Sequence, residues 1–321
     1  MNYEALPLYV NSLIIIGTIV LISKGAHYVI DSAVDIAKRL GISELVIGIT
    51  VVAFGTSVPE FAVTLDAAFR GHGDISVGNI VGSNIFNLGF ILGGCALLRS
   101  IVTSPALLRR DGTVLAISTF LLLGVVAWDL SLSGIDGVLL FVTLLAYLGY
   151  IFWSRQAPDF GDDDEHEDDG RPLWIKWTWL VFGLVCITGG SHLLVGSATA
   201  VAKSFGISEW IIGATVVAAA TSAPELVVSF VAAMKKSYGI SAGNLVGSSI
   251  FNILGVLGLA GMLRPVTLDP MARLSLITLS GLVLVVLLFI RTGWKVSRLE
   301  GLALFTMATA LWWFDFSMRI P

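Results

Sequence analysis

Residues 41–93 read GISELVIGITVVAFGTSVPEFAVTLDAAFRGHGDISVGNIVGSNIFNLGFILG, and residues 206–258 read GISEWIIGATVVAAATSAPELVVSFVAAMKKSYGISAGNLVGSSIFNILGVLG. The two segments align without a gap at a constant offset of 165, and 29 of the 53 positions are identical. Each copy places one glutamate, Glu60 or Glu225, in an otherwise apolar stretch. One carboxylate from each half of a duplicated, apolar chain suggests a cation site between the halves.

The composition predicts the class of protein. Hydrophobic residues make up 56% of the 321 residues, charged residues make up 13%, and the mean hydropathy is +0.89. Because a globular domain carries roughly 25% charged residues, we expect an all-α polytopic membrane protein. At about 20 to 25 apolar residues per span, ten transmembrane helices fit the length. The predicted spans are 8–35, 43–69, 74–98, 113–129, 132–154, 174–201, 208–234, 240–262, 271–291 and 298–318.

The spans divide into two five-helix repeats, residues 1–154 and 174–321, joined by a linker over residues 155–173. Because each repeat has an odd number of spans, the second is inverted relative to the first. With the N-terminus outside, thirteen Lys and Arg residues fall on the inner side and five on the outer side. The positive-inside rule favours this orientation, which places the linker in the cytosol. We expect a multi-pass protein of the plasma membrane.

The linker is strongly acidic, with eight Asp and Glu residues between positions 159 and 169. One interpretation is a solvated linker without fixed structure. The other is a weak cytosolic Ca2+ sensor, although the run lacks the glycine turn and ligand spacing of a defined Ca2+ loop.

Several function classes are disfavoured. The glycines at 78, 82, 243 and 247 have no lysine in the position that a phosphate-binding loop requires, so we expect no ATP. Cys95 and Cys186 lie in apolar helices and are expected to pack there. An intramembrane enzyme with Glu60 and Glu225 as acid and base would lack a nucleophile or a metal triad. We therefore expect no enzyme activity, no cofactor, no nucleic acid and no obligate protein partner apart from the lipid bilayer.

The first copy of the motif, AFGTSVPE, combines a helix break with oxygen donors. Pro59 cannot donate a backbone hydrogen bond, so it kinks the helix and is expected to free the carbonyls of residues 53–56. In a membrane, freed carbonyls are tolerated beside a cavity or an ion. Thr56 and Ser57 precede Glu60 by four and three residues and share its helical face. Hydroxyls, carbonyls and one carboxylate thus converge.

The following helix supplies a second wall, because Asn79, Ser83 and Asn87 recur every four residues. Gly78 and Gly82 are expected to allow close helix contact. The second copy repeats these features in Thr221, Ser222, Pro224, Glu225, Asn244, Ser248 and Asn252.

Together the copies predict a cage of oxygen donors with a charge of −2. Oxygen ligands suit hard cations, and two carboxylates balance one Ca2+. The same cage suits Na+, whereas Mg2+ and soft metals fit it less well. The alternative for the glutamates is a structural polar contact that caps the kinked helix. For the asparagines it is packing, and Asn79 and Asn244 are the expected packing pair.

The motifs GTSVPE…GNIVGSNIFN and ATSAPE…GNLVGSSIFN resemble the two α-repeats of the Ca2+/cation antiporter superfamily, and the chain is similar to prokaryotic sodium/calcium exchangers. The resemblance implies that the glutamates bind Ca2+ directly and that Ca2+ and Na+ compete for one cage. It implies alternating access, with helices 1 and 6 sliding over the core. The implied ligands are Ala53, Thr56, Ser57, Glu60, Ser83, Asn87, Ala218, Thr221, Ser222, Glu225, Ser248 and Asn252.

Three positions depart from the family pattern. Asn252 stands where some exchangers carry Asp, a residue that accompanies K+ dependence, so we expect K+ independence. Ala220 matches Gly55, which predicts a gentler second break. His27 and His192 occupy positions where related sequences often have an acid. The histidines either sense pH or form interhelical hydrogen bonds as neutral imidazoles.

Two transport functions remain open. The first is antiport of Ca2+ against Na+. The second is a Ca2+/H+ antiporter of the same fold, in which Glu60 and Glu225 each carry a proton. Asp66, whose counterpart is Val231, is either a ligand at the entry to the site or an interfacial acid.

Overall fold

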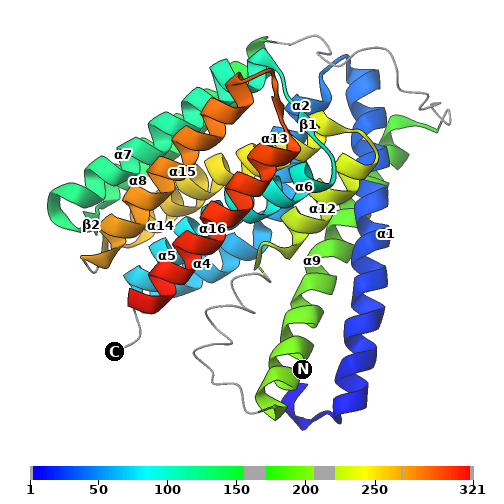
Figure 1. Ribbon diagram of the computed structural model, residues 1–321, viewed down its shortest axis with the longest axis horizontal. Coiled ribbons are helices and arrows are strands. Elements are labelled where there is room, and N and C mark those ends of the chain that lie inside the picture. Colours follow the sequence, from blue (N-terminus) through cyan, green and yellow to red (C-terminus); the bar gives the residue numbers. More distant parts are fainter. Residues whose placement is uncertain (1–2, 155–170, 206–220, 269, 319–321) are drawn as a thin grey trace.

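The computed structural model describes residues 3–154, 171–205, 221–268 and 270–318, and these are almost entirely helical (Figure 1). Its α-helices are α1 (Leu8–Leu40), α2 (Glu44–Ile47), α3 (Ala53–Thr56), α4 (Val58–Arg70), α5 (Gly73–Ile85), α6 (Leu92–Leu98), α7 (Thr113–Asp129), α8 (Gly134–Ser154), α9 (Leu173–Ser204), α12 (Ala223–Met234), α13 (Tyr238–Ile250), α14 (Gly258–Leu263), α15 (Met271–Arg291) and α16 (Arg298–Met318). Four π-helical segments interrupt them, η2 (Gly48–Val52), η3 (Phe86–Ile91), η4 (Leu107–Gly112) and η6 (Phe251–Leu257), and a short 3-10 turn, η1 (Tyr3–Ala5), precedes α1.

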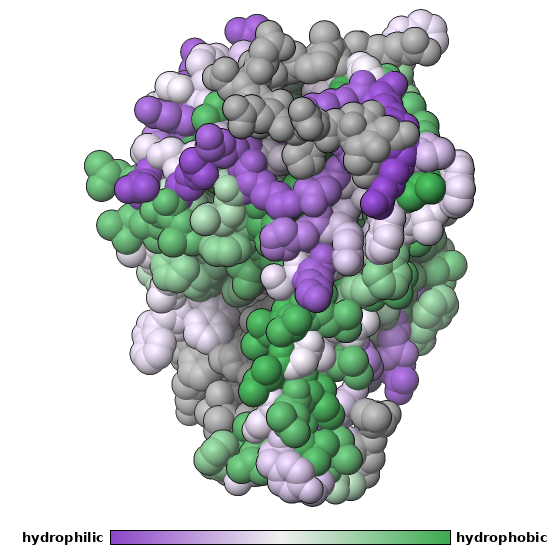
Figure 2. Space-filling view, turned by 90° about the vertical axis from the view of Figure 1, so that its right-hand side faces the viewer, coloured by the Kyte–Doolittle hydropathy of each residue, from purple (hydrophilic) through white to green (hydrophobic). Residues whose placement is uncertain are grey.

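The helices are those of a polytopic membrane protein. Among the described residues, seven helices are long and apolar enough to cross a bilayer, or eight if the bent pair Glu44–Thr56 and Val58–Arg70 is one span. The predicted span 208–234 lies partly outside the described residues. Helix α16 covers the predicted span 298–318 but is not one of the seven. Figure 2 shows an apolar surface along the N-terminal half of α1, where Leu13, Ile16 and Val20 are more than half exposed. Such a surface suits contact with lipid.

Helices α1 and α9 run antiparallel and side by side at one edge of the molecule (Figure 1). Gly25 and Gly183 meet where they cross, because a Cβ on Gly183 would lie 2.6 Å from the Gly25 carbonyl oxygen. Small residues allow this approach in membrane helices. Near one end, Lys176 Nζ lies 2.5 Å from Asp35 Oδ2, with both side chains buried. Near the other end, Lys203 pairs with Glu4 on the surface. These contacts join α9 to α1 at the crossing and near one end, and to the η1 turn before α1 near the other end.

The first motif helix is broken at Ser57, two residues before Pro59. The chain bends by 49° between α3 and α4 at Ser57, and Pro59 is the second residue of α4. Ser222 precedes α12 with nearly the same dihedral angles, φ −87° and ψ 9° against φ −79° and ψ 5° for Ser57. The broken helix predicted from Pro59 is therefore present. Ala220, on which the gentler second break was predicted, lies outside the described residues.

Two short antiparallel strand pairs join distant parts of the chain. β1 (Ile101–Val102) pairs with β4 (Lys295–Val296), and β2 (Ser131–Leu132) pairs with β3 (Val266–Thr267). β1 and β3 are related by the repeat offset of 165, since residue 101 corresponds to 266. Each pair thus joins the first half of the chain to the second.

Helix α13 packs against the first half through glycines. A Cβ on Gly247 would lie 2.6 Å from the Ile49 carbonyl oxygen, and one on Gly243 would lie 2.9 Å from that of Leu45. The predicted close contact is therefore found in the second copy. By the repeat, Gly78 and Gly82 correspond to Gly243 and Gly247, and the segment they would contact corresponds to residues 210–218. Those residues lie outside the described part of the chain, so the prediction for Gly78 and Gly82 is not tested.

The substitution Gly247→Ala is expected to destabilise the protein by about 1–3 kcal/mol, because the added methyl would overlap backbone atoms. The measurement is the melting temperature in detergent. Gly124→Ala in α7 is the matched control, since nothing lies within 4 Å of its Cβ position. Alanine is also the better helix former, so this control should not lower the melting temperature. Equal losses for both variants would contradict the close packing of Gly247.

Candidate functional site

Eleven of the twelve predicted ligand residues are described, and Ala218 lies outside the described residues. None of the eleven is more than 7% exposed, and Glu60 and Glu225 are fully buried. The glutamates lie in the first turns of α4 and α12, directly after the two breaks. Burying two carboxylates in an apolar body is costly unless something compensates their charge.

The two copies meet through reciprocal hydrogen bonds. Ser57 Oγ donates to Glu225 Oε1 at 3.2 Å, and Ser222 Oγ donates to Glu60 Oε1 at 3.2 Å. Ser83 Oγ lies at 3.5 Å from the same oxygen of Glu60. Each glutamate is thus held by the serine at the break of the opposite half. The predicted convergence of hydroxyls and carboxylates is present, and it spans the halves.

Thr56 links the first break to α13. Its hydroxyl lies 3.0 Å from Asn244 Oδ1, 3.2 Å from the Ala53 carbonyl and 3.3 Å from Ser248 Oγ. The Ala53 carbonyl also accepts from the Ser57 amide at 3.1 Å and from Ser248 Oγ at 3.4 Å. The prediction that the break leaves this carbonyl free is therefore wrong. The helix continues through α3, so Ser57 N still completes the bond to residue 53.

Several buried polar atoms at the site have no hydrogen-bond partner within the described part of the chain. They are Glu60 Oε2, Glu225 Oε2, Asn252 Oδ1 and both terminal atoms of Asn87. Leaving a buried acceptor unpaired costs about 1–3 kcal/mol, and more for a charged group. Native proteins keep few such atoms, and each one calls for an explanation. Four unpaired oxygens in one buried cluster have the chemistry of a hard-cation site.

Asn79 and Asn244 each donate a hydrogen bond to a hydroxyl of their own half. Asn79 Nδ2 donates to Thr64 Oγ1 at 3.0 Å, and Asn244 Nδ2 donates to Ser229 Oγ at 2.9 Å. These equivalent contacts fit the predicted packing pair. Asn244 differs in also accepting from Thr56 across the halves.

Sequence reasoning missed Asn84. It is fully buried, donates from Nδ2 to the Ser249 carbonyl at 3.3 Å and accepts from Asn252 Nδ2 at 3.0 Å. The spacing of four residues used to select Asn79, Ser83 and Asn87 leaves it out. A usable signal was the mismatch of Asn84 with Ser249 inside an otherwise matching GS-x-IFN segment.

π-helical turns begin beside both asparagines of the motif. Asn87 is the second residue of η3 and Asn252 the second residue of η6. Such turns interrupt the regular α-helical bonding and occur frequently at functional sites. No pattern in the sequence predicted these turns.

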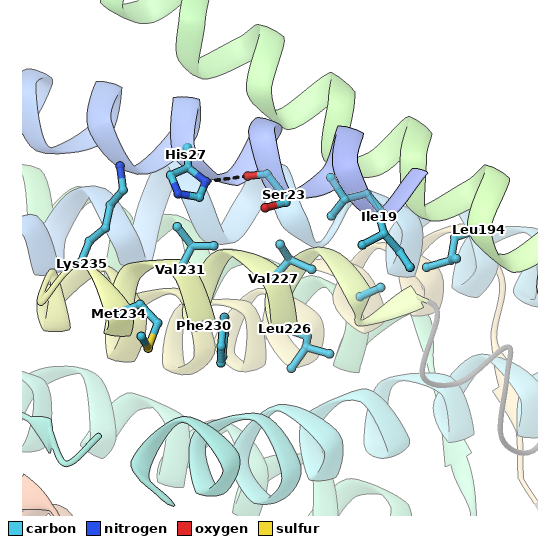
Figure 3. A pocket seen from close by; sticks show the side chains of 12 residues that line it. Ile19, Ser23, His27, Leu194, Leu226, Val227, Phe230, Val231, Met234 and Lys235 are labelled. Carbon is cyan, nitrogen blue, oxygen red and sulfur yellow. Dashed lines mark hydrogen bonds between the residues drawn. The ribbon is translucent and has the colours of Figure 1, made fainter. Parts of the chain in front are cut away.

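His27 lies on α1 and lines a cavity of about 570 Å3 between α1 and α12 (Figure 3). Its Nδ1 lies 2.8 Å from the Ser23 carbonyl oxygen, one turn earlier in the same helix. Because a carbonyl only accepts, Nδ1 carries the hydrogen. The bond is intrahelical, so the interhelical bond expected for His27 is not the contact described. The pH-sensing hypothesis stays a prediction.

Asp66 lies on the surface, where its carboxylate pairs with Arg70 at 2.8 Å. The side chain is 62% exposed, in contrast to the fully buried Glu60 of the same helix. This arrangement fits the interfacial acid of the two interpretations.

Comparison with known proteins gives one consistent result. The family described as "Sodium/calcium exchanger protein" matches residues 10–154 and 175–314. The chain is 35% identical to the putative antiporter CaxA of Alkalimonas amylolytica, covering 90% of this chain and 92% of the relative. It is 34% identical to the sodium/calcium exchanger MaX1 of Methanosarcina acetivorans, covering 92% and 95%. The solved structure of the sodium-calcium exchanger NCX_Mj, soaked with zero Na+ and Ca2+, matches with a TM-score of 0.83 at 27% identity, covering 95% and 98%.

These matches, with the buried site between the halves, define the class as a multi-pass membrane antiporter. The chain belongs to the sodium/calcium exchanger family of the Ca2+/cation antiporters.

Proposed function

We propose that this chain exchanges Ca2+ for Na+ across the plasma membrane by alternating access, without a requirement for K+. The observation that carries the proposal is the reciprocal pairing of each glutamate with the opposite serine, which leaves Oε2 of both glutamates buried and without a partner among the described residues. Two carboxylates balance one Ca2+, and a cation between them would satisfy both orphaned oxygens. The descriptions of MaX1 and NCX_Mj as sodium/calcium exchangers support Na+ as the counter-ion.

The proposed ligands are the eleven described residues of the site together with Ala218. Serine and threonine oxygens would serve Na+ when it replaces Ca2+, because Na+ also prefers oxygen donors. Asn252 carries no charge, which keeps the cage at −2 and supports independence from K+. Exchange is electrogenic if more than two Na+ move per Ca2+.

The proposal includes ten helices in two inverted repeats, with the N-terminus outside and the acidic linker in the cytosol. The strand pairs support it, because β1 and β3 are related by the offset of 165, and the pairs β1–β4 and β2–β3 each join opposite halves. The similar dihedral angles of Ser57 and Ser222 support it as well. The basic residues at the inner ends favour this orientation.

The test is uptake of radiolabelled Ca2+ into proteoliposomes that contain the purified protein. An outward Na+ gradient is compared with an outward H+ gradient, each with and without K+. Uptake that follows the Na+ gradient and ignores K+ is the expected result. Uptake driven by the H+ gradient alone would overturn it and assign the chain to Ca2+/H+ antiport, with Glu60 and Glu225 as proton carriers.

A further inference from the structure

We propose that Asn84 is a positioning residue that fixes the amide of Asn252, so that the Asn252 side-chain oxygen is presented to the transported cation. The inference rests on the proposed function of the site and adds a determinant of its cation selectivity. Asn84 itself is not proposed as a ligand, because both ends of its amide are occupied by other groups.

The orientation follows from a chain of donors and acceptors. The Ser249 carbonyl can only accept, so Asn84 must direct its Nδ2 toward that oxygen, at 3.3 Å. Asn84 Oδ1 then faces Asn252, which must answer with its own Nδ2, at 3.0 Å. Asn252 Oδ1 therefore lies on the other side of the amide. It is buried and, within the described residues, unpaired.

Among the described residues, no equivalent contact orients Asn87, the asparagine of the first half that corresponds to Asn252. At the repeat offset the counterpart of Asn84 is Ser249, whose hydroxyl donates to the Leu245 carbonyl of its own helix at 2.9 Å. Asn87, the counterpart of Asn252, has neither of its terminal atoms paired within the described residues. Asn84 thus fixes the amide of Asn252, whereas within the described residues no contact orients the amide of Asn87. The two asparagines of the motif are chemically unequal.

This inequality bears on the choice of cation. Because its nitrogen donates to Asn84, the amide of Asn252 can present only its oxygen to the site, and oxygen is the ligand that hard cations prefer. The arrangement also disfavours a carboxylate at position 252, because one of its oxygens would face Asn84 Oδ1. Asn84 would then have to turn over and give up its bond to the Ser249 carbonyl. The neutral amide at 252 and the asparagine at 84 therefore support each other.

The test is a double-substitution cycle of Asn84→Ser and Asn252→Asp. Serine is the residue that the second repeat carries at this position. Asn79→Ser is the matched control, since it removes a 3.0 Å amide–hydroxyl bond from the same helix, outside the cluster of unpaired oxygens. Asn84→Ala is prepared alongside, in case the serine hydroxyl makes a bond of its own. The first readout is the Ca2+ concentration that gives half of the maximal rise in melting temperature in detergent. The second is KM and turnover of Ca2+ uptake.

In the otherwise native chain, Asn84→Ser is expected to raise the half-saturating Ca2+ concentration about tenfold, the equivalent of one oriented hydrogen bond. In the Asn252→Asp background the same change should have no effect or lower that concentration, because both terminal atoms are then oxygens. A loss of equal size in both backgrounds, or no loss in the native one, would overturn the inference.

The melting readout does not depend on the driving ion, so it separates the two proposals. If uptake proves to follow the H+ gradient, the proposed function fails, and the cycle still decides whether Asn84 orients Asn252. If wild-type protein shows no Ca2+-dependent rise in melting temperature at all, both proposals fail together.

Discussion

Glu60→Gln and Glu225→Gln are each expected to abolish Na+-dependent Ca2+ uptake, lowering it roughly 100-fold or more. Glutamine keeps the size of the side chain and one carbonyl oxygen, so the contact with the opposite serine can persist. What it removes is half of the charge that balances Ca2+. Losing one partner of a buried charge pair costs about 2–5 kcal/mol, which is about 30-fold to several thousand-fold in affinity. Both variants should be impaired, because each glutamate accepts a hydrogen bond from the serine at the break of the opposite half.

The measurement is uptake into proteoliposomes, with folding checked by gel filtration and melting temperature. Asp129→Asn is the control, since that carboxylate is exposed at the end of α7 and accepts a bond only from the Ser131 amide among the described contacts. It should transport at the wild-type rate. Robust Ca2+ uptake by the Glu60→Gln, Glu225→Gln double variant would remove the central claim.

The largest effect on stability is expected from Lys176→Met. The ammonium of Lys176 and the carboxylate of Asp35 are 2.5 Å apart, with side chains 6% and 8% exposed. Removing the lysine leaves a buried carboxylate whose other oxygen, Oδ1, already has no partner within the described residues. Breaking one side of a buried pair costs about 3–5 kcal/mol. The melting temperature in detergent should fall accordingly.

The substitution Lys203→Met is the matched control, because it breaks an ion pair of the same kind that is exposed instead of buried. Lys203 and Glu4 form an ion pair with side chains 31% and 61% exposed, toward the opposite end of α9. An exposed pair contributes at most about 1 kcal/mol. Adding Asp35→Asn to Lys176→Met should restore part of the lost stability, because the stranded charge disappears. Equal small losses for Lys176→Met and Lys203→Met would show that burial of the Asp35 pair does not matter.

The site could be predicted from the sequence to the extent that the repeat and the helical period determine it. The duplication predicted that Glu60 and Glu225 lie in one site. The period of four predicted that Thr56 and Ser57 share a helical face with Glu60, but the helix is broken at Ser57, and these two side chains contact the second half instead. The proline predicted a broken helix, which the bend at Ser57 confirms. These inferences need only the local geometry of a helix and the symmetry of the repeat, and both can be recognised in the sequence.

The rest depends on contacts between the halves. Which donor reaches which acceptor is decided by the packing of α5 against α13 and η6, so neither the bond between Asn84 and Asn252 nor the occupied Ala53 carbonyl followed from spacing. The buried pair of Lys176 and Asp35 was also unforeseen, because its members are 141 positions apart and unrelated by the repeat. An interpretation that assigns the same role to equivalent residues of the two copies fails where the copies differ, as at Asn84 and Ser249.

The two strand pairs bear on how the chain is made. Because β1 pairs with β4, Ile101 cannot form its strand pair until Val296 has been synthesised, 195 residues later. At about 5–20 residues per second the delay is about 10 to 40 s. β2 likewise waits for β3. During synthesis, both strands of the first half, β1 and β2, therefore remain unpaired until the second half has been made.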